Sequence, residues 1–332
     1  MMKRKVYLIG PKSEAQAAAE QHRAALAGQE LPVELETLDI DPAHFHEQMS
    51  AMLSEPEFLG AKILEPYKQP SLAYCQEITP SARGLGAVNT IVRRPSGLVY
   101  GENTDVLAFV DYLREQGIDR VRTALVLGAG GAARVALAGL RNMNCARYMV
   151  GFGHPRRPAE IASQFKDIRR QISFFQLEDM KNFFGWINDV DFFADRIPLP
   201  PPSYRKSKRR DQGGGDSVKR WDLLVNATPV GDNGSTGESL ITVTNFLRCF
   251  ERVLDLVPSA EPTQLVNLAR SAGVPATHGD VLNRMQEENA REMWLREYRR
   301  LLNGEVDEPR RPAKRSNTGS SRRKPLLRKR NG

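Results

Sequence analysis

The stretch Thr123–Leu140, TALVLGAGGAARVALAGL, carries the strongest local signal in the chain. An apolar run ends in a turn that contains Gly128, Gly130 and Gly131, and an Ala-rich helical pattern follows. Glycines at a strand-to-helix turn let backbone N–H groups approach a pyrophosphate at the helix N-terminus. The alternative is a turn needed only for tight packing, and we favour dinucleotide binding.

Strand-like and helix-like segments alternate on both sides of this stretch. Before it, strands are predicted at KVYLIG (5–10) and VELETLDI (33–40), with a helix at 13–28 between them. After it, strands are predicted at RYMVGF (147–152), DLLVNATPVG (222–231) and RVLDLV (252–257), and a last helix at about Asp280–Leu302. This alternation predicts α/β layers with mostly parallel strands.

Composition excludes two classes of protein. At 332 residues and 40% hydrophobic content the chain can fill the cores of two domains, so wholesale disorder is excluded. It has no long uncharged apolar run, so no membrane span is expected. Cys75, Cys145 and Cys249 are scattered and have no metal-ligand spacing, which is typical of buried thiols in a reducing compartment. No metal site is predicted.

The net charge of +8 lies almost entirely in the C-terminal tail. Residues 308–332 carry ten Lys or Arg and one Glu, so the tail sums to +9 and the rest of the chain to −1. Arg310-Arg311 and Arg322-Arg323-Lys324 have the spacing of a bipartite nuclear import signal. Import or contact with nucleic acid is one interpretation, and a solubilising, disordered tail is an equally good one.

Polar side chains cluster in GAVNTIVRRPSGLVYGENTD (86–105). Asn89-Thr90 and Asn103-Thr104 fall at the ends of two apolar runs, and Asp105 follows directly. Such side chains can bond the hydroxyls of a polyol, although turn capping explains the same spacing. Lys68 follows EPY at a strand end in the same half of the chain, so the fold can bring Lys68 and Asp105 together. A lysine beside a carboxylate in a cleft forms an acid/base pair.

The choice between NAD and NADP stays open. An acidic residue after the strand that follows the Gly-rich turn favours NAD, whereas an arginine there favours NADP. This chain has Phe152 and Gly153 at that place. Arg156 and Arg157 can reach a phosphate, or can be surface charges of the next helix.

A set of motifs together resembles the shikimate dehydrogenase family. They are EPEFLGAKILEPYKQP, ITPSARGLGAVNTIV, GENTD, ALVLGAGGAAR, VNATPVG, PTQLVNLARSAG and HGDVLNRMQEENAREMW, in family order over roughly residues 5–300. The likeness is strongest to the shikimate dehydrogenase-like domains of fungal arom proteins and quinate-pathway repressors. Each motif alone is a weak indication of the family, but the whole set in this order is specific for it.

The resemblance implies an α/β fold with an N-terminal α/β substrate-binding domain and a Rossmann-like, doubly wound dinucleotide-binding domain. The expected divisions are 1–105 for the first domain, 106–279 for the second, 280–303 for a helix that returns to the first, and 304–332 for a disordered basic tail. Residues 198–220, Pro-rich, then basic, then Gly-rich, are expected to be a disordered insertion.

The resemblance also implies site residues. Lys68 and Asp105 match the catalytic pair, and Asn89 and Gln286 match ligands of the substrate. The expected cofactor-binding residues are Gly128, Gly130, Gly131, Ala132, Asn226 and Thr228.

Several family positions are changed. The family holds the substrate carboxylate with two serines after the first strand, where this chain has Gln16 and Ala18; Ser13 and Lys12 are the alternative partners, although nothing in the spacing selects them. The family's Asn-Val-Thr has become Lys62-Ile63-Leu64, and a glycine before the last helix has become Val281, which is expected to crowd the nicotinamide. Each lost hydrogen bond to a charged group removes about 1.5–3 kcal/mol of binding free energy.

Two functions follow as hypotheses. The first is an oxidoreductase of the shikimate/quinate dehydrogenase type that transfers hydride between a cyclic polyol carboxylate and NAD or NADP. The second is a non-catalytic regulator, similar to the quinate repressors, that senses a pathway metabolite and acts in the nucleus through an import factor or nucleic acid. The protein is expected in the cytoplasm, or in the nucleus if 310–324 acts as an import signal. We favour the enzyme because both members of the catalytic pair are present.

Overall fold

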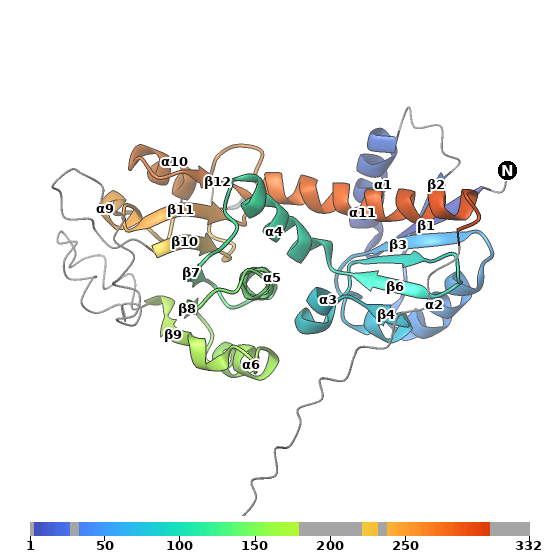
Figure 1. The fold of residues 1–332 in the computed structure, drawn as a ribbon, viewed down its shortest axis with the longest axis horizontal. Coiled ribbons are helices and arrows are strands. Elements are labelled where there is room, and N and C mark those ends of the chain that lie inside the picture. The colour runs from blue at the N-terminus through green and yellow to red at the C-terminus, as the bar shows by residue number, and fades with distance from the viewer. Residues whose placement is uncertain (1–2, 27–32, 179–220, 232–237, 306–332) are drawn as a thin grey trace, which may run out of the picture.

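Two six-stranded sheets and one long helix that reaches both of them make up the fold (Figure 1). The computed structural model describes residues 3–26, 33–178, 221–231 and 238–305. The insertion expected at 198–220 and nearly all of the basic tail, 306–332, lie outside the described residues. The domain divisions given above stay predictions.

The first sheet has the strand order β2-β1-β3-β5-β6-β4. β1 is parallel to β2 and β3, β4 is parallel to β6, and β5 is antiparallel to both β3 and β6. Helices α1 and α11 cover one face and α2 covers the other, as the residues shared by each core cluster show. The bounds are β1 Arg4–Ile9, β2 Val33–Leu38, β3 Phe58–Ile63, β4 Glu77–Ile78, β5 Thr90–Arg93, β6 Val99–Glu102, α1 Lys12–Leu26, α2 Phe45–Ser54 and α3 Pro80–Leu85, with short 3-10 turns at Pro42–His44 and Pro70–Tyr74.

The second sheet has the order β12-β11-β10-β7-β8-β9, and all of its strand pairs are parallel. Numbered from β7 as strand 1 along the chain and read from the β9 edge, this is the doubly wound order 3-2-1-4-5-6. The direction in which strands are added to the sheet reverses between β7 and β10. The bounds are β7 Thr123–Leu127, β8 Arg147–Phe152, β9 Ile172–Gln176, β10 Trp221–Asn226, β11 Phe250–Asp255, β12 Ala276–Thr277, α4 Thr104–Glu115, α5 Gly131–Asn142, α6 Arg157–Gln164, α9 Thr244–Leu247, α10 Gln264–Ser271 and α11 Gly279–Leu302, with a 3-10 turn at Arg169–Gln171. The expected α/β architecture is confirmed.

The central strands are apolar because they are buried on both faces. All five residues of β7 are buried, as is typical of a strand inside a parallel sheet. In β1 the side chains alternate instead between two cores: Val6 and Leu8 pack beneath α1 and α11, whereas Tyr7 and Ile9 pack toward α2. No helix in the described ranges is long and apolar enough to cross a membrane.

Helix α11 packs into the cores of both sheets. Near its start Leu282 belongs to the core around β7, and further along Trp294 and Tyr298 belong to the core of the first sheet. The indole Nε1 of Trp294 donates to the carbonyl of Ile91 at 3.3 Å. Gly60 of β3 makes room for this ring, since a Cβ there would lie 2.6 Å from it. The helix therefore fixes how the two sheets face each other.

Replacing Trp294 by alanine tests this anchor. We expect Trp294→Ala to lower the free energy of unfolding by about 3–5 kcal/mol, because a fully buried aromatic ring leaves a cavity. Urea denaturation followed by circular dichroism measures the change. Leu302→Ala is the control, since Leu302 on the same helix is 45% exposed and should change the stability little. Equal stabilities of the two variants would contradict the anchoring role.

Candidate functional site

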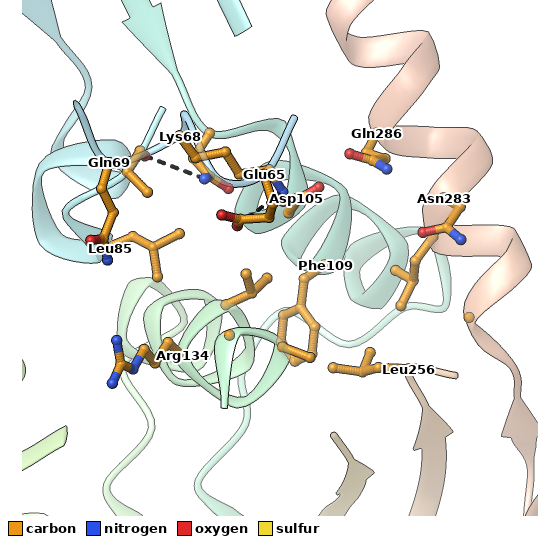
Figure 2. Close-up of a pocket in the computed structure, with 17 residues that line it drawn as sticks. Glu65, Lys68, Gln69, Leu85, Asp105, Phe109, Arg134, Leu256, Asn283 and Gln286 are labelled. Carbon is orange, nitrogen blue, oxygen red and sulfur yellow. Dashed lines mark hydrogen bonds and ion pairs between the residues drawn. The ribbon is translucent and has the colours of Figure 1, made fainter. Parts of the chain in front are cut away.

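A cavity of about 360 Å³ lies between the two sheets, beside the first turns of α4 and α5 (Figure 2). Its position next to β7 is where a doubly wound sheet places its ligand, and its volume is in the usual range for a small-molecule site. Figure 2 shows Gln286 and Asn283 projecting from α11 toward the space that Lys68 and Asp105 face. The lining residues are Glu65, Lys68, Gln69, Leu85, Ala87, Asn103, Asp105, Phe109, Gly131, Ala132, Arg134, Val135, Leu256, Gly279, Leu282, Asn283 and Gln286.

Lys68 and Asp105 meet in this cavity. Lys68 Nζ donates to Asp105 Oδ2 at 3.2 Å, and Glu65 Oε1 lies 3.9 Å from the same ammonium group. The side chains of Lys68 and Asp105 are 22% and 21% exposed, so each keeps a path to a ligand. The structure thus brings together two residues that are 37 positions apart in the sequence.

The start of α4 is held so that Asp105 reaches Lys68. Asn103 caps the helix by accepting from Val106 N at 3.2 Å, as the turn-capping interpretation predicts. Asn89 Oδ1 accepts from the backbone N of Thr104 at 2.8 Å and from the Thr104 hydroxyl at 3.1 Å. Asn89 is fully buried behind this turn, and its Nδ2 makes no hydrogen bond to the described residues. This leaves one buried amide donor behind the first turn of α4, at a residue that is not among those lining the cavity.

The charges around Lys68 keep it protonated. Burial lowers the pKa of Lys68, but the carboxylates of Asp105, Glu65 and Glu287 outweigh it, so that the pKa lies above its usual value. At neutral pH Lys68 is therefore an ammonium group that can donate a proton.

The Gly-rich turn at the end of β7 has the shape of a backbone cradle. Gly128 has φ +105°, and a Cβ on it would lie 2.7 Å from the Ala227 carbonyl oxygen, so only glycine fits. At Gly130 and Gly131 a Cβ would meet nothing within 4 Å, and Gly131 and Ala132 line the cavity. Open space over the N-terminus of α5 suits an anionic group.

The segment after β10 lies against this turn. Asn226 donates to Asp255 Oδ1 at 2.8 Å and accepts from the Thr228 hydroxyl at 2.7 Å. Burial raises the pKa of Asp255, and the hydrogen bonds that it accepts from Thr263 and Asn226 oppose this rise. The side chains of Asn226 and Thr228 thus bond to each other and fix the backbone beside Gly128. Their predicted contact with the cofactor stays a prediction.

The changed family positions have distinct surroundings. Leu64 and Ala18 pack against the same apolar core, and Gln16 is exposed, so no hydroxyl replaces the family's serines there. Val281 packs against the core around β7, whereas its neighbours Gly279 and Leu282 line the cavity. Lys62 is buried and contacts Gln286 and Glu287.

The sequence interpretation missed several lining residues. Glu65 and Gln69 flank Lys68 on its loop, and Asn283 lies one turn before Gln286 on α11. Their closeness in the sequence to predicted site residues was the signal that could have found them. Arg134 stands in the quoted Gly-rich stretch and pairs with Glu160 of α6 at 2.6 Å. Only the fold brings these four side chains to one cavity. Within the described ranges no cluster of His, Cys, Asp and Glu suits a metal ion.

Comparison with known proteins agrees with this geometry. The family model of the shikimate dehydrogenase substrate binding domain matches residues 8–91. Shikimate dehydrogenase (NADP(+)) of Salinibacter ruber is 30% identical over 251 residues, which cover 66% of this chain and 87% of that protein. The chain belongs to the shikimate dehydrogenase family. The resemblance inferred from the motifs is confirmed.

Other members match over different shares of their length. The Symbiobacterium thermophilum dehydrogenase is 28% identical over 284 residues, or 84% of each chain. The pentafunctional AROM polypeptide of Yarrowia lipolytica is 32% identical over 130 residues, which make up 8% of that polypeptide. The crystal structure of shikimate 5-dehydrogenase from Listeria monocytogenes superposes with a TM-score of 0.69 at 20% identity, over 89% of this chain and 92% of that one, and shows the shared fold.

The charge coupling in the cavity predicts the behaviour of a variant. In Asp105→Asn the pKa of Lys68 should fall, because burial still disfavours the ammonium form while its strongest partner is gone. The pH dependence of Lys68 labelling by an amine-reactive reagent, read by mass spectrometry, measures this pKa. Glu65→Gln should shift it less, since Glu65 is 73% exposed and 3.9 Å away. An unchanged labelling midpoint in Asp105→Asn would refute the coupling.

Proposed function

We propose that this member of the family is an NAD(P)-dependent oxidoreductase that interconverts a ring alcohol and the corresponding ketone of a cyclic polyol carboxylate such as shikimate. The Lys68–Asp105 pair, placed in one cavity with the Gly-rich turn, is the observation that carries the proposal. The Listeria monocytogenes structure contains shikimate and NAD, which supports the same pair of ligand classes here.

Lys68 handles the hydroxyl proton in this proposal. In the reduction, protonated Lys68 donates its proton to the carbonyl oxygen, and in the oxidation neutral Lys68 takes the hydroxyl proton back. Asp105 stabilises the ammonium form and orients its N–H groups. The nicotinamide, when bound, supplies or accepts the hydride at the substrate carbon. The alcohol and the oxidised cofactor thus become the ketone, the reduced cofactor and one proton.

The glycine cradle and two arginines would hold the cofactor. Gly130 and Gly131 leave the space that a pyrophosphate needs at the N-terminus of α5, and Gly128 lets the turn pack closely against Ala227. Arg134 and Arg157 both contact Glu160 Oε2, at 2.6 and 2.9 Å, just beyond the end of β8. Two guanidinium groups at this place favour a ribose 2′-phosphate, so we infer a preference for NADP.

Gln286 would hold the substrate ring, because it lines the cavity from α11. Asn89 is fully buried and is not among the lining residues, so its expected contact with the substrate stays a prediction. Its Nδ2 has no hydrogen-bond partner among the described residues. The apolar packing of Leu64 and Ala18 supports a substrate that is held less by α1 than by α4 and α11.

Turnover by the purified full-length protein tests the proposal. With shikimate or quinate we expect reduction of NADP faster than of NAD, and a loss of about 10²–10⁴-fold in kcat for Lys68→Met, the range for a removed acid/base group. Because the pKa of Lys68 is raised, the rate of alcohol oxidation should increase with pH into the alkaline range.

Two results would decide against the enzyme. The first is the absence of turnover with either substrate and either cofactor, in protein shown to be folded by circular dichroism. The second is a Lys68→Met variant that is as active as the wild type. Lys5→Met is the matched control, because Lys5 is also ion-paired to carboxylates in the first sheet but lies outside the cavity.

The basic tail motivates a separate localisation test, which also addresses the regulator hypothesis. If 310–324 is an import signal, a fluorescent fusion of the full-length chain should enter the nucleus, and the same fusion without residues 308–332 should not. Equal distribution of the two fusions would reject the import signal and with it most of the support for a nuclear regulator.

A further inference from the structure

Lys62 is a charged side chain in the interior, on strand β3. Its side chain is 2% exposed, and Nζ lies 3.1 Å from Glu287 Oε1 and donates to Gln286 Oε1 at 3.1 Å. Gln286 and Glu287 are adjacent on α11, and Gln286 lines the cavity while Glu287 contacts His22 of α1. An ammonium group is costly to bury unless it is paired and hydrogen-bonded, and Lys62 has both kinds of contact.

Glu287 is the counter-charge of Lys62. Its Oε2 lies 2.7 Å from His22 Nε2, and the other ring nitrogen, Nδ1, lies 3.4 Å from Arg291 Nη1. A guanidinium group only donates, so Nδ1 of His22 is the acceptor in its contact with Arg291. Burial disfavours the charged form of Glu287, but Lys62 and His22 outweigh it and lower its pKa to about 2. Lys62 and Glu287 thus form a neutral pair of charges.

The contact with Lys62 decides which end of the Gln286 amide faces the cavity. An ammonium group has donors only, so its hydrogen-bond partner must be an acceptor. Lys62 can therefore bond only Oε1 of Gln286. The two hydrogens of Nε2 are left for a ligand in the cavity, toward which Gln286 projects in Figure 2.

We propose that Lys62 is a positioning residue that fixes the Gln286 carboxamide with its Nε2 toward the cavity, so that the substrate presents a hydrogen-bond acceptor, such as a carboxylate or carbonyl oxygen, to α11. This inference rests on the proposed function and names the chemistry of one substrate subsite. In this proposal the Gln286 Nε2 donor on α11 holds the substrate's acceptor, and Lys62 on β3 sets the direction of that donor.

Steady-state kinetics with shikimate tests the proposal. In Lys62→Met the amide can rotate, and we expect KM to rise about fivefold to tenfold, the effect of one hydrogen bond, with kcat changed less than about twofold because Lys68 and Asp105 are untouched. Gln286→Glu keeps an acceptor for Lys62 but replaces the donor by a carboxylate, and KM should rise about tenfold to a hundredfold. Lys5→Met should leave KM unchanged. An unchanged KM in both Lys62→Met and Gln286→Glu overturns the proposal.

A double variant separates positioning from charge balance. Lys62→Met alone leaves Glu287 without its counter-charge and should destabilise the fold, and Lys62→Met/Glu287→Met removes both charges and should restore much of the stability. If Lys62 positions Gln286, KM stays raised in the double variant. If KM returns to the wild-type value together with the stability, Lys62 only balances Glu287 and the proposal is wrong.

A measurement without substrate keeps this test independent of the proposed function. In protein labelled with ¹⁵N at glutamine side chains, the Gln286 NH₂ signals are assigned by their loss in Gln286→Glu. They should shift in Lys62→Met and stay in place in Lys5→Met. If the wild type does not turn over shikimate, the proposed function fails, and this spectrum still decides on Lys62: unshifted Gln286 signals overturn the positioning role.

Discussion

The packing of α11 across both sheets is the constraint on which the rest of the structure depends. Leu282 is buried with the second sheet and Trp294 with the first, and a helix fixes the distance between such positions at about 1.5 Å per residue. Gln286 lies between these two anchors, so its position relative to both sheets is set by the helix itself. The wall of the cavity that α11 provides follows from apolar packing at either end.

The Lys62–Glu287 pair adds to the apolar packing that sets the rotation of α11 about its own axis, because a turn of the helix that moved Glu287 away would leave a buried charge unpaired. Breaking a buried pair in this way typically costs about 3–5 kcal/mol. The same rotation that keeps Glu287 on Lys62 keeps Gln286 toward the cavity, so charge pairing between β3 and α11 contributes to what a ligand meets.

Much of the fold could be predicted from the sequence, because its signals are local. The strand, glycine turn and helix at Thr123–Leu140 are read from neighbouring residues, and Gly128 occupies the left-handed conformation that the pattern implies. The Lys68–Asp105 contact was also predicted, from polar groups at strand ends and from family likeness. The role of Lys62 could not be predicted, since it depends on Gln286 and Glu287, more than 220 positions away. In the sequence Lys62 is only a departure from the family's Asn, and the substrate-binding hydroxyl is lost at Leu64.

The changed positions around the cavity can be explained together. Where the family has serine hydroxyls near α1, this chain has Ala18, which packs with Leu64 against one apolar core and offers a substrate carboxylate no hydroxyl. The lysine introduced at 62 does not reach the cavity surface, because its side chain is 2% exposed. It acts on the cavity through Gln286, whose oxygen it occupies and whose nitrogen it leaves free. The chain thus has no serine donors near α1, and it orients the Gln286 donor on α11. Both features suit a substrate whose hydrogen-bond acceptor is held from α11.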